Sequence, residues 1–155
     1  MDSTFHLAQL NIAVAKAPLT SPLMADFVSN LERINALAES APGFVWRLKD
    51  DDGDATAIRP FDENTLVNMS VWRDLDALKQ YVYSSAHVDF VRRRRDWFQL
   101  PQAASVVLWW VPDGHLPEVD EAVAKLRQLR ESGPTVGAFT FTQPFPPPDA
   151  SVSNA

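Results

Sequence analysis

The chain has 155 residues, 46% of them hydrophobic and 22% charged, which excludes a disordered protein and favours a single globular domain. Cysteine is absent, so disulfides, thiolate metal sites, iron–sulfur clusters and cysteine nucleophiles are excluded. The formal net charge of −6 argues against nucleic acids and anionic membranes as partners, because a negative field repels phosphate.

The first third of the chain predicts a strand, a helix and a second strand. Residues 5–14 alternate with a period of two, and one face of this strand is apolar while the other becomes polar. In residues 24–40 the apolar side chains recur every three or four positions, as in an amphipathic helix, with Ser21 as its N-cap and Pro22 in its first turn. Residues 44–49 are expected to form the second strand, which ends at an acidic loop containing glycine.

The middle of the chain predicts two more strands separated by helical segments. Residues 65–72 are rich in β-branched and apolar types and alternate along the strand. Asp74 follows as the cap of a helix, and a break near residues 84–85 leads into a second helical piece, 86–98. Residues 104–111 form a nearly continuous apolar run, which predicts a strand covered on both faces.

The C-terminal part predicts one further helix and one further strand. The helix spans residues 117–132 and stops at Gly133, and the short strand spans residues 137–143. The proline-rich segment 144–155 has too little apolar content to fold, so we expect a disordered tail after a single domain of residues 1–143.

Without the last helix and strand, the element order is β-α-β-β-α-β, the ferredoxin-like split pattern of an α+β fold, in which helices cover one face of the sheet. The other face carries aromatic and aliphatic side chains that cannot be left exposed to water. A symmetric homodimer that packs sheet against sheet is therefore expected.

The segment from Asn68 to Trp72, Asn-Met-Ser-Val-Trp, leads into the helix Asp74-Leu-Asp-Ala-Leu-Lys-Gln-Tyr81. This arrangement resembles the antibiotic-biosynthesis-monooxygenase type of dimeric α/β barrel. Over residues 5–141 the chain is identified as a member of an uncharacterised bacterial family in that superfamily, domain-of-unknown-function family number 3291. The segments that carry this closer resemblance are 7–12, 43–48, 68–72, 109–115, 133–134 and 138–141.

The resemblance implies a cavity between the sheet and the helices of each protomer. Some relatives oxidise polycyclic phenols to quinones without a cofactor, and the resemblance implies this type of reaction as an expectation. An Asn and a Trp of the equivalent strand contact the substrate there, together with an Arg and a Tyr. Asn68 and Trp72 match the first two residue by residue, whereas no single Arg or Tyr aligns with the others.

Asn68 and Trp72 lie four residues apart on a strand and so point the same way. An amide can bind a phenolate or a developing oxyanion, and an indole can stack on an aromatic substrate while donating through its N–H. The alternative is that Trp72 belongs to the core and that Asn68 bonds a neighbouring backbone group.

His87 begins a helical piece on which Arg94 and Phe98 share its side. With a pKa near neutrality, His87 is a candidate general base toward a phenol, or a candidate axial ligand of haem. Because Arg92 to Arg95 point around the helix, at least one should face inward, and Arg94 is the candidate for an anionic ligand. The alternatives are a structural histidine and a solvated ion pair with a neighbouring aspartate.

Four of the five tryptophans lie on predicted strands, which gives an aromatic interior suited to a flat hydrophobic ligand. Trp46 and Trp109 therefore join Trp72 and Phe98 as candidate substrate-binding residues, with core packing as the alternative. The three histidines show no metal-ligand spacing, and nucleotide-binding and common hydrolase motifs are absent from the sequence, so we expect no metal and no nucleotide cofactor.

The function expected from these residues is that of a small enzyme acting on an aromatic or polyketide-like molecule in natural-product biosynthesis. It would work either by cofactor-independent oxygenation or by acid–base rearrangement as a cyclase or isomerase, with His87, Asn68 and Arg94 as catalytic residues. The alternatives are a non-catalytic ligand-binding dimer and a haem protein that uses His87. The first residues lack the pattern of a signal peptide and no long apolar run occurs, so we expect a cytoplasmic protein.

Overall fold

The computed structural model describes residues 5–49, 56, 58–84, 87–88, 92–101 and 103–148. At its centre lies a four-stranded antiparallel sheet in the order β2-β3-β1-β4. The strands are β1 (Phe5–Val14), β2 (Phe44–Arg47), β3 (Thr65–Trp72) and β4 (Val106–Pro112). This strand order is that of the ferredoxin-like α+β fold, as the sequence predicted.

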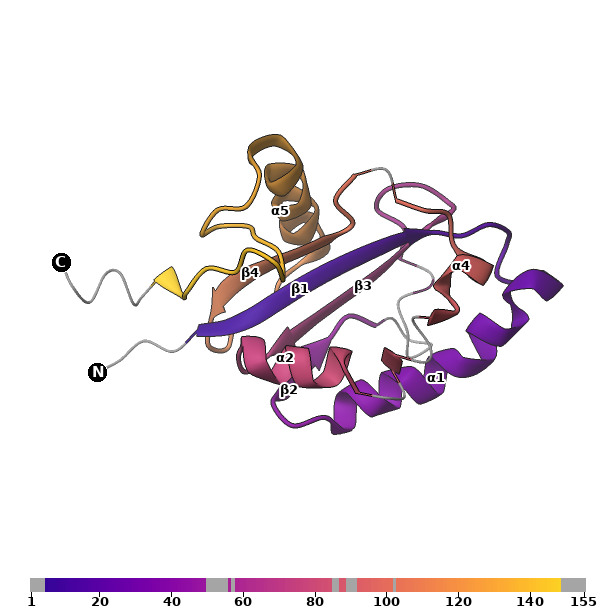
Figure 1. The fold of residues 1–155 in the computed structure, drawn as a ribbon, viewed down its shortest axis with the longest axis horizontal. Helices are drawn as coiled ribbons and strands as arrows, with labels where there is room; N and C mark the ends of the chain where they lie inside the picture. The colour runs from indigo at the N-terminus through magenta and orange to yellow at the C-terminus, as the bar shows by residue number, and fades with distance from the viewer. Residues whose placement is uncertain are drawn as a thin grey trace.

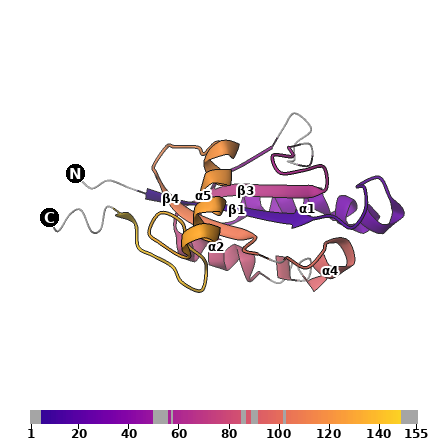
Figure 2. The same cartoon turned by 90° about the horizontal axis from the view of Figure 1, so that it is seen from above.

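Helices lie on both sides of the sheet (Figure 1). They are the 3₁₀ turn η1 (Pro22–Met24) and the α-helices α1 (Ala25–Ser40), α2 (Leu75–Val82), α4 (Arg94–Trp97) and α5 (Val119–Ser132). Figures 1 and 2 show α1 and α2 on one face and α5 on the other. No helix in the described part of the chain is both long and apolar enough to cross a membrane.

The helix caps follow the sequence signals only in part. Asp74 caps α2 as expected, because its Oδ1 accepts a hydrogen bond from the Ala77 amide at 2.8 Å. Ser21 precedes the helical segment but makes no capping bond with its side chain, and its hydroxyl donates instead to the Pro18 carbonyl at 2.6 Å. The first turn after Ser21 is therefore the 3₁₀ turn, and α1 begins only at Ala25.

One face of the sheet packs against α5. Its buried side chains are alternate residues of three strands, namely Ala8, Leu10, Val67, Met69, Val71, Val107, Trp109 and Val111. Ala122, Leu126 and Leu129 form the matching apolar stripe of α5. The expectation that this face is bare is wrong, because α5 of the same chain packs against it, while the homodimer itself stays a prediction.

The opposite face has two separate apolar clusters. The cluster beneath α2 includes Leu7, Trp72, Leu78, Leu108 and Phe139. The cluster near the beginning of α1 contains Ala15, Met24, Phe27, Leu66 and Trp97. Between the two clusters, β1 and β3 carry polar side chains.

The C-terminal segment differs from the expectation. Residues 137–143 do not form a strand; Phe139 makes an isolated antiparallel bridge with Leu108, and Thr135 pairs with Ala138 in a turn. The beginning of the proline-rich segment packs on the sheet, because the Trp110 indole N–H donates to the Phe145 carbonyl at 2.8 Å. The expected disorder thus does not include Phe145, whose ring lies 6.0 Å from that of Phe139.

Two expected features fall wholly or partly outside the described residues. The acidic loop 50–53 is one of them. The other is the helical piece 86–98, of which His87, Val88 and Arg92 have helical backbone, followed by α4.

Candidate functional site

A band of four polar side chains crosses the middle of the sheet on the face of α1 and α2. Gln9 pairs with Ser70 across β1 and β3, and Asn11 pairs with Asn68. The next pair along the same face is Leu7 with Trp72, which belongs to the cluster beneath α2. The polar band therefore fills the interval between the two apolar clusters of this face.

The band is open to solvent at one position. β3 has a neighbour on each side in the sheet, yet Asn68 is exposed while the other residues of β3 are buried. A residue in a central strand beneath a helical layer is normally covered. The exposure of Asn68 therefore shows that no helix covers the sheet at this position.

A hydrogen-bond network fixes the four polar side chains. Ser70 Oγ accepts from the Trp72 indole N–H at 2.8 Å and from Gln9 Nε2 at 2.9 Å. Asn68 Oδ1 accepts from Gln9 Nε2 at 2.7 Å and from Asn11 Nδ2 at 3.1 Å. Asn11 Nδ2 also donates to Gln9 Oε1 at 3.0 Å.

The network leaves one donor available to a ligand. Both donors to Asn68 act on its Oδ1, and Nδ2 of Asn68 has no hydrogen-bond partner among the residues that the structure describes. By contrast, the indole N–H of Trp72 is already engaged by Ser70. Asn68 can thus present an N–H to a ligand, whereas Trp72 is 1% exposed and packs within the core, as the alternative from the sequence has it.

Trp72 belongs to a stack of rings that leads to His87. Tyr81 of α2 stacks on Trp72 with ring centroids 5.1 Å apart, and His87 lies 4.7 Å from Tyr81. The Tyr81 hydroxyl donates to the Ile34 carbonyl at 3.2 Å. Burial raises the pKa of Tyr81 to about 12, against a smaller lowering by Arg47, so its phenol stays neutral and serves to hold the stack.

One ring nitrogen of His87 is hydrogen-bonded, and the other has no partner among the residues that the structure describes. Its Nδ1 lies 3.0 Å from the Val82 carbonyl, and because a carbonyl oxygen only accepts, Nδ1 carries the proton. Nε2 then has a lone pair, and no partner of Nε2 exists within the described segments. Burial lowers the pKa of His87 below its ordinary value of 6.5, with an opposing effect from the bond to Val82, so the imidazole is neutral at pH 7.

The four consecutive arginines are all exposed, so the expectation that at least one faces the interior is wrong. Arg93 pairs with Asp26 at 2.7 Å and with Asp96 at 3.6 Å. The inward arginine is instead Arg47 of β2, whose side chain is 10% exposed and bonds Glu39 of α1 at 2.9 Å.

A cleft of about 480 Å³ lies beside the arginines. It is lined by Val82, Tyr83, Val88, Arg92, Arg94 and Arg95. Val82 supplies the carbonyl that holds His87, and Val88 follows His87 in the chain, so His87 adjoins this cleft.

The remaining candidates from the sequence lie elsewhere. Trp46 and Trp109 belong to the opposite face of the sheet, where the Trp109 indole N–H donates to Glu121 of α5 at 2.9 Å. Phe98 packs edge-on against Phe27 at 5.0 Å, in the cluster near the beginning of α1. The structure thus places Asn68 and Trp72 on one face of the sheet and links Trp72 to His87 through Tyr81, with Arg94 at the neighbouring cleft, whereas Trp46 and Trp109 lie on the opposite face.

Sequence reasoning missed Gln9, Asn11 and Ser70 as parts of the site. The available signal was the position of polar residues at every second place on the inward face of two strands that are otherwise apolar. Asn35 gives a similar signal on α1, where it is 9% exposed in the stripe that faces the sheet.

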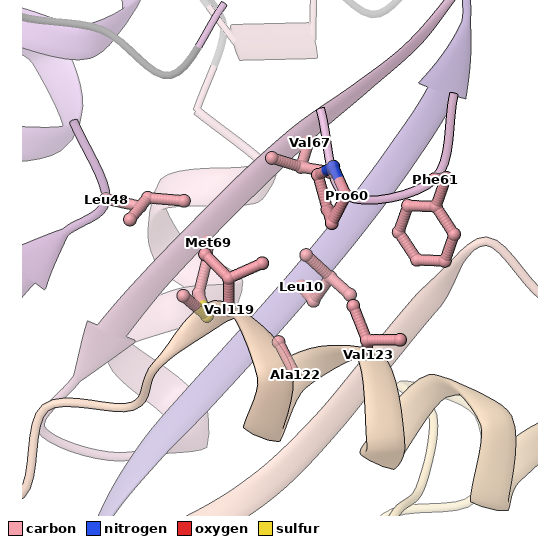
Figure 3. A pocket seen from close by; sticks show the side chains of 9 residues that line it. All are labelled: Leu10, Leu48, Pro60, Phe61, Val67, Met69, Val119, Ala122 and Val123. Carbon is pink, nitrogen blue, oxygen red and sulfur yellow. The ribbon is translucent and has the colours of Figure 1, made fainter. Parts of the chain in front are cut away.

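A second hollow lies on the α5 face (Figure 3). Its lining is entirely apolar and includes Leu10, Met69 and Val123, and it leaves no room for a water molecule. This crevice is a packing feature of the core. Within the described ranges no three His, Asp or Glu side chains gather as they would around a metal ion.

Comparison with known proteins bears on the family and the fold. The family model described as "Domain of unknown function (DUF3291)" matches residues 6–155. No curated protein is significantly similar to the chain in sequence.

Several solved structures are similar in fold. A conserved protein from Methanosarcina mazei has a TM-score of 0.51 and 8% identity, covering 68% of this chain and 92% of its own. The cofactor-independent oxygenase SnoaB from Streptomyces nogalater has a TM-score of 0.47 and 22% identity, covering 73% and 98%. The protein PA3566 from Pseudomonas aeruginosa has a TM-score of 0.48 and 16% identity, covering 74% and 97%.

Proposed function

This chain belongs to the family described as "Domain of unknown function (DUF3291)", a description that names no activity, and we propose that it is an enzyme that removes a proton from a small aromatic substrate. The observation that carries the proposal is that two polar groups on the same side of the sheet have no hydrogen-bond partner among the described residues. One is Nε2 of His87, which can accept a proton, and the other is Nδ2 of Asn68, which can donate a hydrogen bond to an anion.

His87 has the protonation state that a general base needs. Its lowered pKa keeps the imidazole neutral at pH 7, and the bond from Nδ1 to the Val82 carbonyl fixes the tautomer with the lone pair on Nε2. When Nε2 takes up a proton, the Val82 carbonyl also stabilises the resulting imidazolium. Tyr81 holds the ring in place through their contact at 4.7 Å.

Removal of a proton from a phenol or an anthrone produces an oxyanion. Asn68 is suited to bind this oxygen, because Gln9 and Asn11 already hold its Oδ1 and the amide needs no reorganisation during the reaction.

The substrate anion has two possible fates, and both begin with the same proton transfer. In an oxygenation, the CH₂ carbon of a hydroxyanthrone reacts with O₂ and becomes the carbonyl of a quinone. One oxygen atom enters the product and the other leaves as water, so O₂ is the oxidant and no cofactor is required. In a rearrangement, the anion attacks another carbon of the same molecule and is reprotonated. A role in natural-product biosynthesis in the cytoplasm is part of this proposal.

Oxygen uptake and quinone absorbance with hydroxyanthrone substrates test the proposal. We expect His87→Gln to lower turnover by on the order of a hundredfold, the usual scale for removal of a general base. Asn68→Ala should lower kcat by a similar factor, on the order of a hundredfold, as does loss of an oxyanion donor. His115→Gln is the matched control, because His115 is exposed and pairs with Glu121 on the α5 side, and its turnover should equal that of the wild type. Turnover in His87→Gln equal to that of the control would contradict the proposal.

A second candidate function is haem binding, favoured by the same geometry of His87. An axial histidine donates its Nδ1–H to a carbonyl and binds iron through Nε2, and His87 has this arrangement. Titration with haemin would then produce a Soret band that His87→Gln lacks. An identical spectrum in both proteins would exclude this function.

A homodimer also remains a proposal. Partly exposed apolar residues pack against the core of the α5 face and offer a surface for a second protomer, namely Ile12, Trp46, Leu48, Ile58 and Phe61.

A further inference from the structure

The cleft beside α4 combines apolar walls with positive charge. Val82 and Val88 contribute aliphatic surface, and Tyr83 contributes a ring that is 68% exposed. Arg94 and Arg95 lie at the same cleft and are both exposed. An aromatic ring and aliphatic surface bind apolar atoms, while guanidinium groups bind carboxylate, sulfonate or phosphate oxygens.

The charges of Arg94 and Arg95 are not neutralised within the described residues. Arg93 is engaged by Asp26 and Asp96, whereas neither Arg94 nor Arg95 pairs with a carboxylate in the described part of the chain. Lys16 adds a further positive charge beside them, because its Nζ donates to the Arg95 carbonyl.

This concentration of positive charge stands out in a chain whose formal net charge is −6. A cleft lined by one sign of charge concentrates the opposite ion locally. The acidic surface elsewhere repels large polyanions, and the cleft volume of about 480 Å³ lies within the range of small-molecule sites, roughly 300–1,000 Å³. A positively charged cleft of this volume on an otherwise acidic protein therefore fits a small anion better than a nucleic acid or a membrane surface.

We propose that this cleft binds the anionic group of an aromatic substrate and that Arg94 and Arg95 select substrates bearing such a group. The inference rests on the proposed function, since the cleft lies beside the chain segment that carries His87. It goes further by naming the substrate class, an aromatic molecule that carries a carboxylate or a phosphate ester.

Two fluorescent dyes that share a ring system test the charge requirement. Anilinonaphthalenesulfonate is a flat aromatic anion, and phenylnaphthylamine is the equivalent molecule without the sulfonate. We expect the double variant Arg94→Gln/Arg95→Gln to bind the sulfonate dye more weakly by on the order of tenfold at low salt, and the neutral dye with unchanged affinity. Added salt should weaken binding of the anionic dye to the wild type and leave the neutral dye unaffected.

Arg127→Gln is the matched control, because Arg127 is exposed on α5 on the other side of the sheet. It should bind both dyes as the wild type does. Benzoate and phenyl phosphate should displace the sulfonate dye while benzyl alcohol does not, and the more effective anion identifies the preferred group. Equal loss of both dyes in the double variant, or equal loss of the anionic dye in Arg127→Gln, would overturn the inference.

The dye measurements do not depend on turnover. If the protein turns over hydroxyanthrones but its cleft does not distinguish the two dyes, only the proposed selection by charge is refuted. If the cleft does distinguish the two dyes but the protein neither oxidises nor rearranges any hydroxyanthrone, only the proposed function is refuted.

Discussion

Ser70 is the residue on which the floor of the site depends. Its hydroxyl accepts hydrogen bonds from the Trp72 indole and from Gln9, and Gln9 in turn holds Asn68. All of these groups except Asn68 are largely buried, so water cannot easily replace a lost partner.

Ser70→Ala should therefore lower the free energy of unfolding by about 1–3 kcal/mol, the cost of leaving buried donors without an acceptor. Denaturant unfolding measures the difference. Ser29→Ala, at an exposed position on α1, is the control and should change stability by no more than about 0.5 kcal/mol. Wild-type stability in Ser70→Ala would show that water satisfies the Trp72 indole.

His87 should make stability and activity depend on pH in the same direction. Its pKa is lowered from 6.5 in the folded chain and is about 6.5 in the unfolded chain, so below pH 6.5 the unfolded state binds more protons. The resulting contribution to stability is present above pH 6.5 and is lost as the pH falls through the folded-state pKa.

The acid limb of kcat/KM should correspondingly lie below pH 6.5, because the neutral imidazole is the active form. Unfolding experiments on the wild type and His87→Gln at about pH 7.5 and about pH 5 isolate the stability effect, since the glutamine variant lacks this titration. A larger acid-induced loss of stability in the variant than in the wild type would be inconsistent with a neutral, buried His87.

At the scale of elements, the turn between α1 and β2 approaches α2 closely. Gly43 has φ +83°, and a Cβ atom placed there would lie 2.5 Å from Cβ of Ala77 in α2. The Gly43 carbonyl also accepts from the Arg73 amide at 2.7 Å, which fixes the turn against the beginning of α2.

Gly43→Ala should therefore combine backbone strain of about 1–2 kcal/mol with a steric cost of about 1–3 kcal/mol. Gly114→Ala is the matched control, because Gly114 has φ +90° but a Cβ atom placed there would meet nothing within 4 Å, so it should show the strain alone. Thermal unfolding of the two variants separates the contributions. Equal destabilisation would mean that the turn moves away from α2 without cost.

The C-terminal segment makes a second testable contact between elements. Truncation after Gln143 removes Phe145, and with it the acceptor of the Trp110 indole and a ring against Phe139. We expect this truncation to lower stability by about 1–3 kcal/mol. Truncation after Pro148 keeps both contacts and should leave the melting temperature unchanged. Equal melting temperatures for both truncated chains would show that the contact of Phe145 contributes nothing.

The sequence predicted correctly those helices and strands that are determined by residues close together in the chain. Alternation gave β1 and β3 with the bounds that the structure has, and Asp74 was identified as a cap from its position before an apolar periodic segment. Residues 137–143 also alternate, but only Phe139 pairs with β4, since a strand requires a partner along its length and alternation alone does not supply one.

At the scale of the whole molecule, the distribution of the tryptophans over the two faces was beyond prediction. Alternation separates Trp46 from Arg47 and Trp109 from Trp110, but it does not tell which set meets the helices. That choice depends on α5, which covers the face that the β-α-β-β-α-β order leaves open. For the same reason Asn68 and Trp72 could be placed together, whereas Trp46 and Trp109 were wrongly grouped with them.

The proposed homodimer is tested at this scale by light scattering and sedimentation. We expect a species of twice the chain mass of 17.3 kDa at micromolar concentration. Phe61→Asp, at the edge of the crevice on the α5 face, should shift the protein toward the monomer, whereas Tyr83→Asp on the far side should not. A wild-type monomer at all concentrations would refute the dimer.

The polar band of β1 and β3 divides into a fixed half and an adjustable half. Gln9 and Ser70 are buried and tied to Trp72, while Asn11 is only partly covered and Asn68 is exposed. Substitutions at Asn11 and Asn68 therefore alter what the site offers a ligand without disturbing either apolar cluster. The chemistry of the site can thus be altered at two positions while the scaffold persists.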